Sequence, residues 1–120
     1  MDETFGYPPA RWQDAKEEAR RAMILTASHE QLMTYADLVE GIAAIHFQPH
    51  DFNLFHLLGQ ISTSEKNSGR GMLSAVVVTA EDQAPGQGFF KLAKELGIAF
   101  DDQTEFWATE LKVVYTTWNK

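Results

Sequence analysis

Three of the four histidines in the chain lie close together, in the stretch from His46 to His56. Imidazole nitrogens are good zinc ligands, and Asp51 adds a carboxylate to the same stretch. However, Pro49 breaks the helix that would place His46 and His50 on one face, and the spacing matches no metal signature. We therefore expect the histidines to lie in a surface loop and predict no bound metal.

The polar stretch from Ser62 to Gly71 is a second candidate site, and Glu65 and Arg70 bracket its central part. Its backbone N–H groups and Arg70 could bind an anion. It lacks the Gly-x4-Gly-Lys-Ser/Thr spacing of a phosphate loop, and its glycines precede an expected strand rather than a helix. The alternative is a helix end followed by a solvated loop, with Glu65 and Arg70 as an ion pair. Both interpretations stay open at this point.

Other residue patterns give little support to catalysis. Ser74 lacks a Gly-x-Ser-x-Gly motif, so we expect a small core residue. The chain has no cysteine, which excludes thiolate chemistry and disulfides. The turn Pro85–Gly88 matches only half of a Gly-x-Gly-x-x-Gly pattern, and we expect it to start a helix packed through Phe89 and Phe90. The sequence predicts no catalytic residue and no cofactor.

The charge distribution bears more directly on function. The formal net charge is −7, and no Lys or Arg occurs between Ala22 and Glu65. Phosphate backbones are bound by Lys and Arg, so this stretch predicts a poor nucleic-acid surface. An acidic field favours a cationic partner, although acidity also serves solubility alone. We predict that the partner-binding residues are the carboxylates Asp37, Glu40, Asp51 and Glu65, with Arg70 setting the register.

Apolar periodicity and capping signals predict three helices in the first half of the chain. The first begins near Pro9 and ends between Ser28 and Met33. A capping box at Thr34 starts the second, which Gln48-Pro49 ends. The third begins at Asp51, ends near Lys66 and carries Phe52, Phe55, Leu58 and Ile61 or Ser62 along its apolar stripe.

The second half alternates between strand and helix patterns. The run Met72 to Thr79 predicts a strand buried on both faces, with Ile98–Phe100 as its short partner. Helices are expected from Gly88 to Leu96, with Gly97 just past the end, and from Gln103 to Trp118. The sequence thus predicts one α+β domain over residues 1–120, with about five helices around a small sheet in a winged-helix-like arrangement.

Two resemblances rest on these motifs. The chain resembles a family of short uncharacterised bacterial proteins over about residues 58 to 118. The resemblance rests on Gly69-Arg70 with Leu73–Val78, then the Pro-Gly-x-Gly-Phe-Phe turn and helix, then Phe-Trp-x2-Glu-Leu. It implies a bacterial origin and a freestanding domain. The chain is also similar in its order of elements to the winged-helix part of alkylguanine alkyltransferase-like proteins. That order is Tyr35-x-Asp37-Leu-Val, a helix, an apolar strand and a glycine-rich turn. That family's Pro-Cys-His-Arg motif is absent, so only the scaffold is implied.

These observations favour a non-enzymatic interaction domain that neutralises a basic partner, such as a bacterial immunity protein or antitoxin for a cationic toxin. One alternative is a winged-helix nucleic-acid binder that uses Lys66, Arg70, Lys91 and Lys94. Another is an enzyme that uses Glu65, Arg70 or the histidine stretch. No apolar run approaches the roughly 20 residues that span a bilayer, and no signal peptide is visible, so we expect a cytoplasmic protein without a membrane association.

Overall fold

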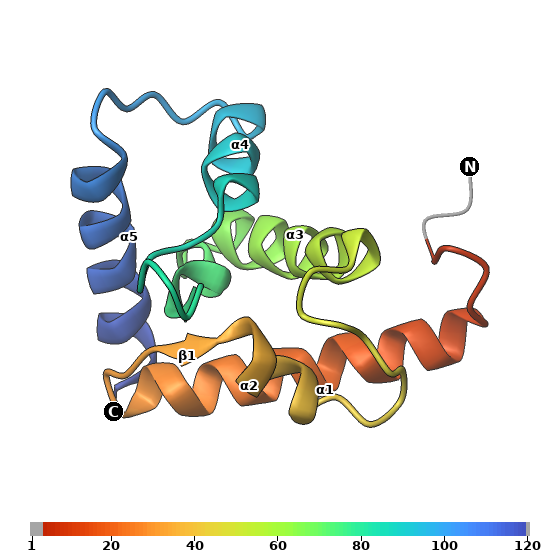
Figure 1. Ribbon diagram of the computed structural model, residues 1–120. Helices are drawn as coiled ribbons and strands as arrows, with labels where there is room; N and C mark the ends of the chain where they lie inside the picture. Colours follow the sequence, from red (N-terminus) through yellow and green to blue (C-terminus); the bar gives the residue numbers. More distant parts are fainter. Residues whose placement is uncertain (1–3, 120) are drawn as a thin grey trace.

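Five α-helices surround a buried, irregular segment in the computed structural model, which describes residues 4–119. The helices are α1 (Pro9–Ser28), α2 (Tyr35–Glu40), α3 (Phe52–Asn67), α4 (Gln87–Glu95) and α5 (Gln103–Trp118). The segment consists of a 3₁₀ turn η1 (Leu73–Val76) and the strand β2 (Val77–Val78), which pairs with β1 (Met33–Thr34). Both α3 and α5 pack against α1, and α4 packs against α3 (Figure 1). The predicted α+β class, mostly helical with a small sheet, is confirmed.

The strand expected from Met72 to Thr79 is wrong over most of its length. Only Val77–Val78 is extended in a sheet, and it pairs in parallel with β1 rather than with Ile98–Phe100. The predicted burial on both faces is confirmed, since Met72–Val78 is buried throughout. Apolar, β-branched content indicates burial as well as extension. Here side chains of α3 and α5 supply three hydrogen bonds to the buried backbone, in addition to bonds within the 3₁₀ turn and to β1.

The second helix begins as predicted and ends early. Thr34 Oγ1 accepts from the N–H of Asp37 at 3.1 Å, and the Asp37 carboxylate accepts from the N–H of Thr34 at 3.1 Å, so the capping box is confirmed. The helix ends at Glu40, whereas the sequence predicts an end at Gln48. Gly41, directly after Glu40, has the low helix propensity that favours such an end.

A loop follows α2 and still buries the apolar residues expected on that helix. Ile42 and Ile45 are 5% and 4% exposed. The Glu18 carboxylate on α1 accepts from the N–H groups of Ala43 and Ala44, at 3.1 and 2.9 Å. These two bonds from a neighbouring helix replace the intrahelical bonds that a longer α2 would have made.

The bounds of α3 agree with the prediction, and Leu58, Ile61 and Ser62 of the predicted stripe are buried, but the two phenylalanines of the stripe are not. Phe52 and Phe55, expected on the apolar stripe, are 71% and 41% exposed. Asp51 is the N-cap residue by backbone conformation, yet its carboxylate accepts from the N–H of Gln48 at 2.8 Å instead of capping α3. The face of α3 toward the core consists of Leu54, Leu57, Leu58, Ile61, Ser62 and Glu65.

The last two helices match their predicted bounds to within one residue. Gly97 follows α4 with φ +84°, the left-handed conformation expected of a glycine after a helix. The aromatic residues of α5 pack half-buried against the core, as expected of a core stripe, whereas Val114 and Glu110 are its buried residues. In residues 4–119, none of the helices has the length and apolar character that a bilayer crossing requires.

Gly71 marks the closest approach of the buried segment to α5. Its φ is +85°, and a Cβ there would lie 3.1 Å from Val113 Cγ1 and 3.1 Å from Val114 Cγ2. Gly97 has almost the same φ, +84°, with no atom within 4 Å of its Cβ position. The two glycines therefore differ in packing and share the backbone conformation.

Gly71→Ala should lower the free energy of unfolding by about 2–5 kcal/mol, because backbone strain of about 1–2 kcal/mol adds to overpacking of about 1–3 kcal/mol. Gly97→Ala, the matched control, should lose only the strain contribution of about 1–2 kcal/mol. Urea unfolding of both variants measures the difference. Equal losses would show that the contact with α5 is unimportant.

Candidate functional site

Polar side chains from α3 and α5 bind the backbone of the buried segment. Glu110 Oε2 accepts from the N–H of Met72 at 2.8 Å, and Ser62 Oγ accepts from the N–H of Ser74 at 3.0 Å. Trp107 Nε1 donates to the carbonyl oxygen of Ala75 at 2.8 Å. A buried backbone group without a partner costs roughly as much as a lost hydrogen bond. These side chains therefore take the place of neighbouring strands.

One of these side chains is a buried carboxylate that needs a cation. Glu110 is 3% exposed, and Lys66 Nζ lies 3.0 Å from each of its oxygens. Lys66 is at the C-terminal end of α3 and Glu110 is in the middle of α5. The pair therefore joins these two helices beside the start of the buried segment.

A second buried carboxylate, Glu65, binds two arginines. Arg70 donates from Nε and Nη2 to the two oxygens, at 2.8 and 2.9 Å, and Arg20 Nε donates at 3.2 Å. The hydrogen bonds from Arg70 lower the pKa of Glu65, burial opposes this effect, and Arg20 lowers the pKa further. The Arg20 guanidinium lies 5.5 Å from the centre of the Trp118 ring. The ion pair between Glu65 and Arg70 is thus confirmed, with Arg20 as a third member that the sequence did not indicate.

The structure places the five predicted partner-binding residues in different environments. Asp37 and Glu40 are exposed on α2, and Asp51 is half-buried at the start of α3. Glu65 is 2% exposed with both oxygens bound to arginines, so its carboxylate acts inside the protein. The Arg70 side chain is 36% exposed. The set is therefore not a single row of exposed charges, and its part in binding stays a prediction.

Two of the three histidines lie in the expected surface loop, but His56 is half-buried on α3, and Ser74 is a core residue as expected. His46 and His50 are exposed in the loop before α3, while His56 packs edge-on against Phe5 at 4.8 Å between ring centroids. Residues 4–119 contain no group of three His, Asp or Glu side chains placed to hold a metal. Ser74 is 7% exposed and shares a 2.7 Å hydrogen bond with the Ser62 hydroxyl, as a core residue.

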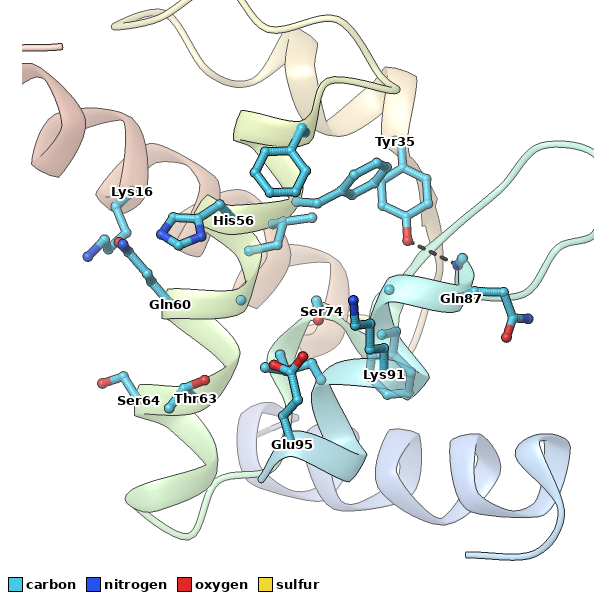
Figure 2. A pocket seen from close by; sticks show the side chains of 18 of the residues that line it. Lys16, Tyr35, His56, Gln60, Thr63, Ser64, Ser74, Gln87, Lys91 and Glu95 are labelled. Carbon is cyan, nitrogen blue, oxygen red and sulfur yellow. Dashed lines mark hydrogen bonds between the residues drawn. The ribbon is translucent and has the colours of Figure 1, made fainter. Parts of the chain in front are cut away.

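A groove of about 1090 Å³ lies between α3 and α4, with Tyr35 of α2 at one end (Figure 2). Its apolar lining comes from both helices and includes Phe52, Phe55, Leu58, Phe89 and Leu92. The volume is slightly above the range of about 300–1,000 Å³ typical of small-molecule sites. Such a groove is the part of this molecule best shaped to hold a ligand.

Tyr35 is fixed at the end of the groove by one hydrogen bond. Its hydroxyl oxygen accepts from the N–H of Gly86 at 3.2 Å, which leaves the hydroxyl proton available to a ligand. Burial raises the pKa of Tyr35, and the bond from Gly86 acts in the opposite direction. The hydroxyl therefore stays protonated at neutral pH and can serve as a donor.

Three charged residues line the groove: Lys16 on α1, and Lys91 and Glu95 on α4. Figure 2 shows Lys91 and Glu95 on the side of α4 that faces the space between α3 and α4. Within residues 4–119, neither lysine has a carboxylate at ion-pair distance, in contrast to Lys66, Arg20 and Arg70. The groove therefore combines an apolar wall with two uncommitted cations.

The groove was not predicted from the sequence, although a glycine in the middle of a helix was a sign of it. Gly59 lies in the middle of α3, where glycine costs about 1 kcal/mol relative to alanine. A Cβ there would meet only Leu92 Cδ2, at an ordinary 3.9 Å, so close helix packing does not require a glycine. Gly59 lines the groove, and its missing side chain leaves that wall open.

Glu65→Gln should lower the free energy of unfolding by about 3 kcal/mol at pH 7, because it leaves two arginines beside a buried group with no charge. Since the pKa of Glu65 is lowered on folding, its contribution is fully present above the ordinary value of 4.5 and is lost as the pH falls through the lower folded value. Unfolding by denaturant between pH 7 and pH 2 measures both effects.

The control is Glu17→Gln, since Glu17 is exposed on α1. It should change stability by less than about 0.5 kcal/mol and leave the acid dependence intact. If Glu65→Gln keeps the steep acid dependence of the wild type below pH 4.5, the bonds to Arg70 and Arg20 are not its source.

Comparisons with protein-family models, with curated proteins and with solved structures found no match to this chain. The resemblances to the short bacterial family and to the winged-helix scaffold therefore stay predictions.

Proposed function

We propose that the protein is a non-enzymatic interaction domain that binds and neutralises a basic protein, as a bacterial immunity protein or antitoxin neutralises a cationic toxin. The observation that carries the proposal is the commitment of cations to the interior network. Lys66, Arg20 and Arg70 are paired with Glu65 and Glu110, and these five side chains carry a net charge of +1. Since the whole chain has a net charge of −7, the remaining residues together have a net charge of −8.

The exposed acidic residues of α2 are the best placed to meet such a partner. Asp37 and Glu40 lie in the stretch from Ala22 to Glu65, which contains no Lys or Arg to compensate them. Uncompensated surface carboxylates attract a cationic protein at long range and speed its association. Asp51 adds a third carboxylate, and the exposed part of Arg70 would set the register against an acidic group of the partner.

The nucleic-acid alternative has less support. Of its four candidate cations, Lys66 and Arg70 are held by Glu110 and Glu65. Lys94 lies over the ring of Phe100, 5.4 Å from its centre. Because phosphate binding depends on free Lys and Arg, these contacts leave Lys91 as the one uncommitted cation of the four.

A pull-down with tagged protein from lysate of the source cell tests the proposal. We expect a single basic protein that is retained at low salt and lost at high salt, because exposed charge pairs are screened. Asp37→Asn with Glu40→Gln should slow association with that protein about tenfold or more, and the Asn side chain can still accept the capping hydrogen bond of Thr34.

The matched control is Glu105→Gln on α5, which removes an exposed carboxylate near a helix N-terminus and should leave association unchanged. Recovery of nucleic acid in place of a basic protein would favour the winged-helix alternative. Equal association rates for the wild type and the α2 variant would remove Asp37 and Glu40 from the interface.

A further inference from the structure

We infer that the groove between α3 and α4 is a binding site for a small amphipathic carboxylate, with the apolar body between Phe55, Leu58 and Leu92 and the head group at Lys91 and the Tyr35 hydroxyl. This inference goes beyond the proposed function, since it concerns a small molecule at a site that none of the predicted partner-binding residues lines.

One wall of the groove is apolar and includes exposed aromatic rings. Phe52 is 71% exposed and Phe55 is 41% exposed, and both line the groove. Tyr35 packs edge-on against Phe55 at 5.6 Å between ring centroids, which holds that ring at the mouth. Covering exposed aromatic surface releases ordered water and favours an occupant with an apolar body.

Small residues on both sides keep the groove open. Gly59 on α3 and Gly88 on α4 line it, and a Cβ at Gly88 would meet no atom within 4 Å. Gly59 has an ordinary helical backbone, so neither backbone conformation nor packing calls for a glycine there. The space that these residues leave is the space an occupant would fill.

The charges in the groove favour an anionic head group. Two lysines and one glutamate line it, although the chain as a whole has a net charge of −7. Lys16 and Lys91 are not neutralised by any carboxylate at ion-pair distance within the described residues. A carboxylate can accept from an ammonium and a phenol at once, and such charge-assisted bonds are the stronger ones.

Titration of the full chain with three ten-carbon probes tests the inference: decanoate, decanol and decylammonium, each below its micelle-forming concentration. We expect decanoate to bind at one site and to shift the amide signals of Gly59, Gly86 and residues 87–92 in a ¹⁵N NMR spectrum. Decanol should bind about tenfold more weakly, because it lacks the charge-assisted bond. Decylammonium should bind more weakly still, since the lining has two lysines and one glutamate, Glu95.

Lys91→Met should weaken decanoate binding about tenfold and leave decanol binding unchanged, because only the head-group charge is lost. Lys94→Met on the same helix is the matched control and should leave both affinities unchanged, since Lys94 does not line the groove. Gly59→Leu should abolish binding of both probes by filling the wall. Thermal unfolding of each variant checks that it is folded.

The inference is overturned if decylammonium or decanol binds as tightly as decanoate, since Lys91 and Tyr35 would then not select the head group. It is also overturned if Lys91→Met and Lys94→Met weaken binding equally, or if the shifted amides lie away from the residues that line the groove. Should Gly59→Leu fail to fold, the comparison of the two lysine variants decides.

Discussion

The structure depends on satisfying the backbone of one buried, non-helical segment, Met72–Val78. A helix or a central strand meets its own hydrogen-bonding needs through regular ladders, whereas this segment has only a two-residue parallel pairing with β1. Two further bonds lie within the segment, from the N–H of Ala75 to the carbonyl oxygen of Met72 and from the N–H of Val77 to that of Ser74. The other partners are side chains of α3 and α5: Glu110, Ser62 and Trp107. Those helices must therefore pack on either side of the segment, and their orientation is set by bonds to its backbone as well as by apolar contact.

That solution places charge in the interior and determines the charge of the surface. A carboxylate that serves a buried N–H needs a cation nearby, because an unpaired buried charge is strongly unfavourable. Lys66 meets this need for Glu110, and the arginines meet it for Glu65. Replacing buried ion pairs by apolar residues is often neutral for stability, so such pairs act mainly through geometry, here by joining α1, α3 and α5. These pairs commit three cations and two carboxylates to one another, with the carboxylates buried and the cations partly exposed.

The groove results from how α3 is used. One face of this helix packs on the core through Leu54, Leu57 and Ile61, and so Phe52 and Phe55 are left on the side toward α2 and α4. Because α4 is short and Gly59 has no side chain, the space between α3 and α4 is not filled from either side. The exposed carboxylates of α2, Asp37 and Glu40, do not line this groove, so occupancy of one does not presuppose occupancy of the other.

Local signals in the sequence were enough to predict the ends of α1, α4 and α5 and the capping box of Thr34 and Asp37, while the ion pair of Glu65 with Arg70 was one of two interpretations that the spacing allowed. Caps, proline, glycine and neighbouring charges act within a few residues, so they can be recognised from spacing alone. The exposure of Phe52 and Phe55 on α3, the end of α2 and the conformation of Met72–Val78 depended instead on tertiary packing. Each of these depended on a partner distant in sequence, such as Glu18 for the loop after α2 and Glu110 for Met72. The groove was decided in the same way, because it exists only where α2, α3 and α4 meet.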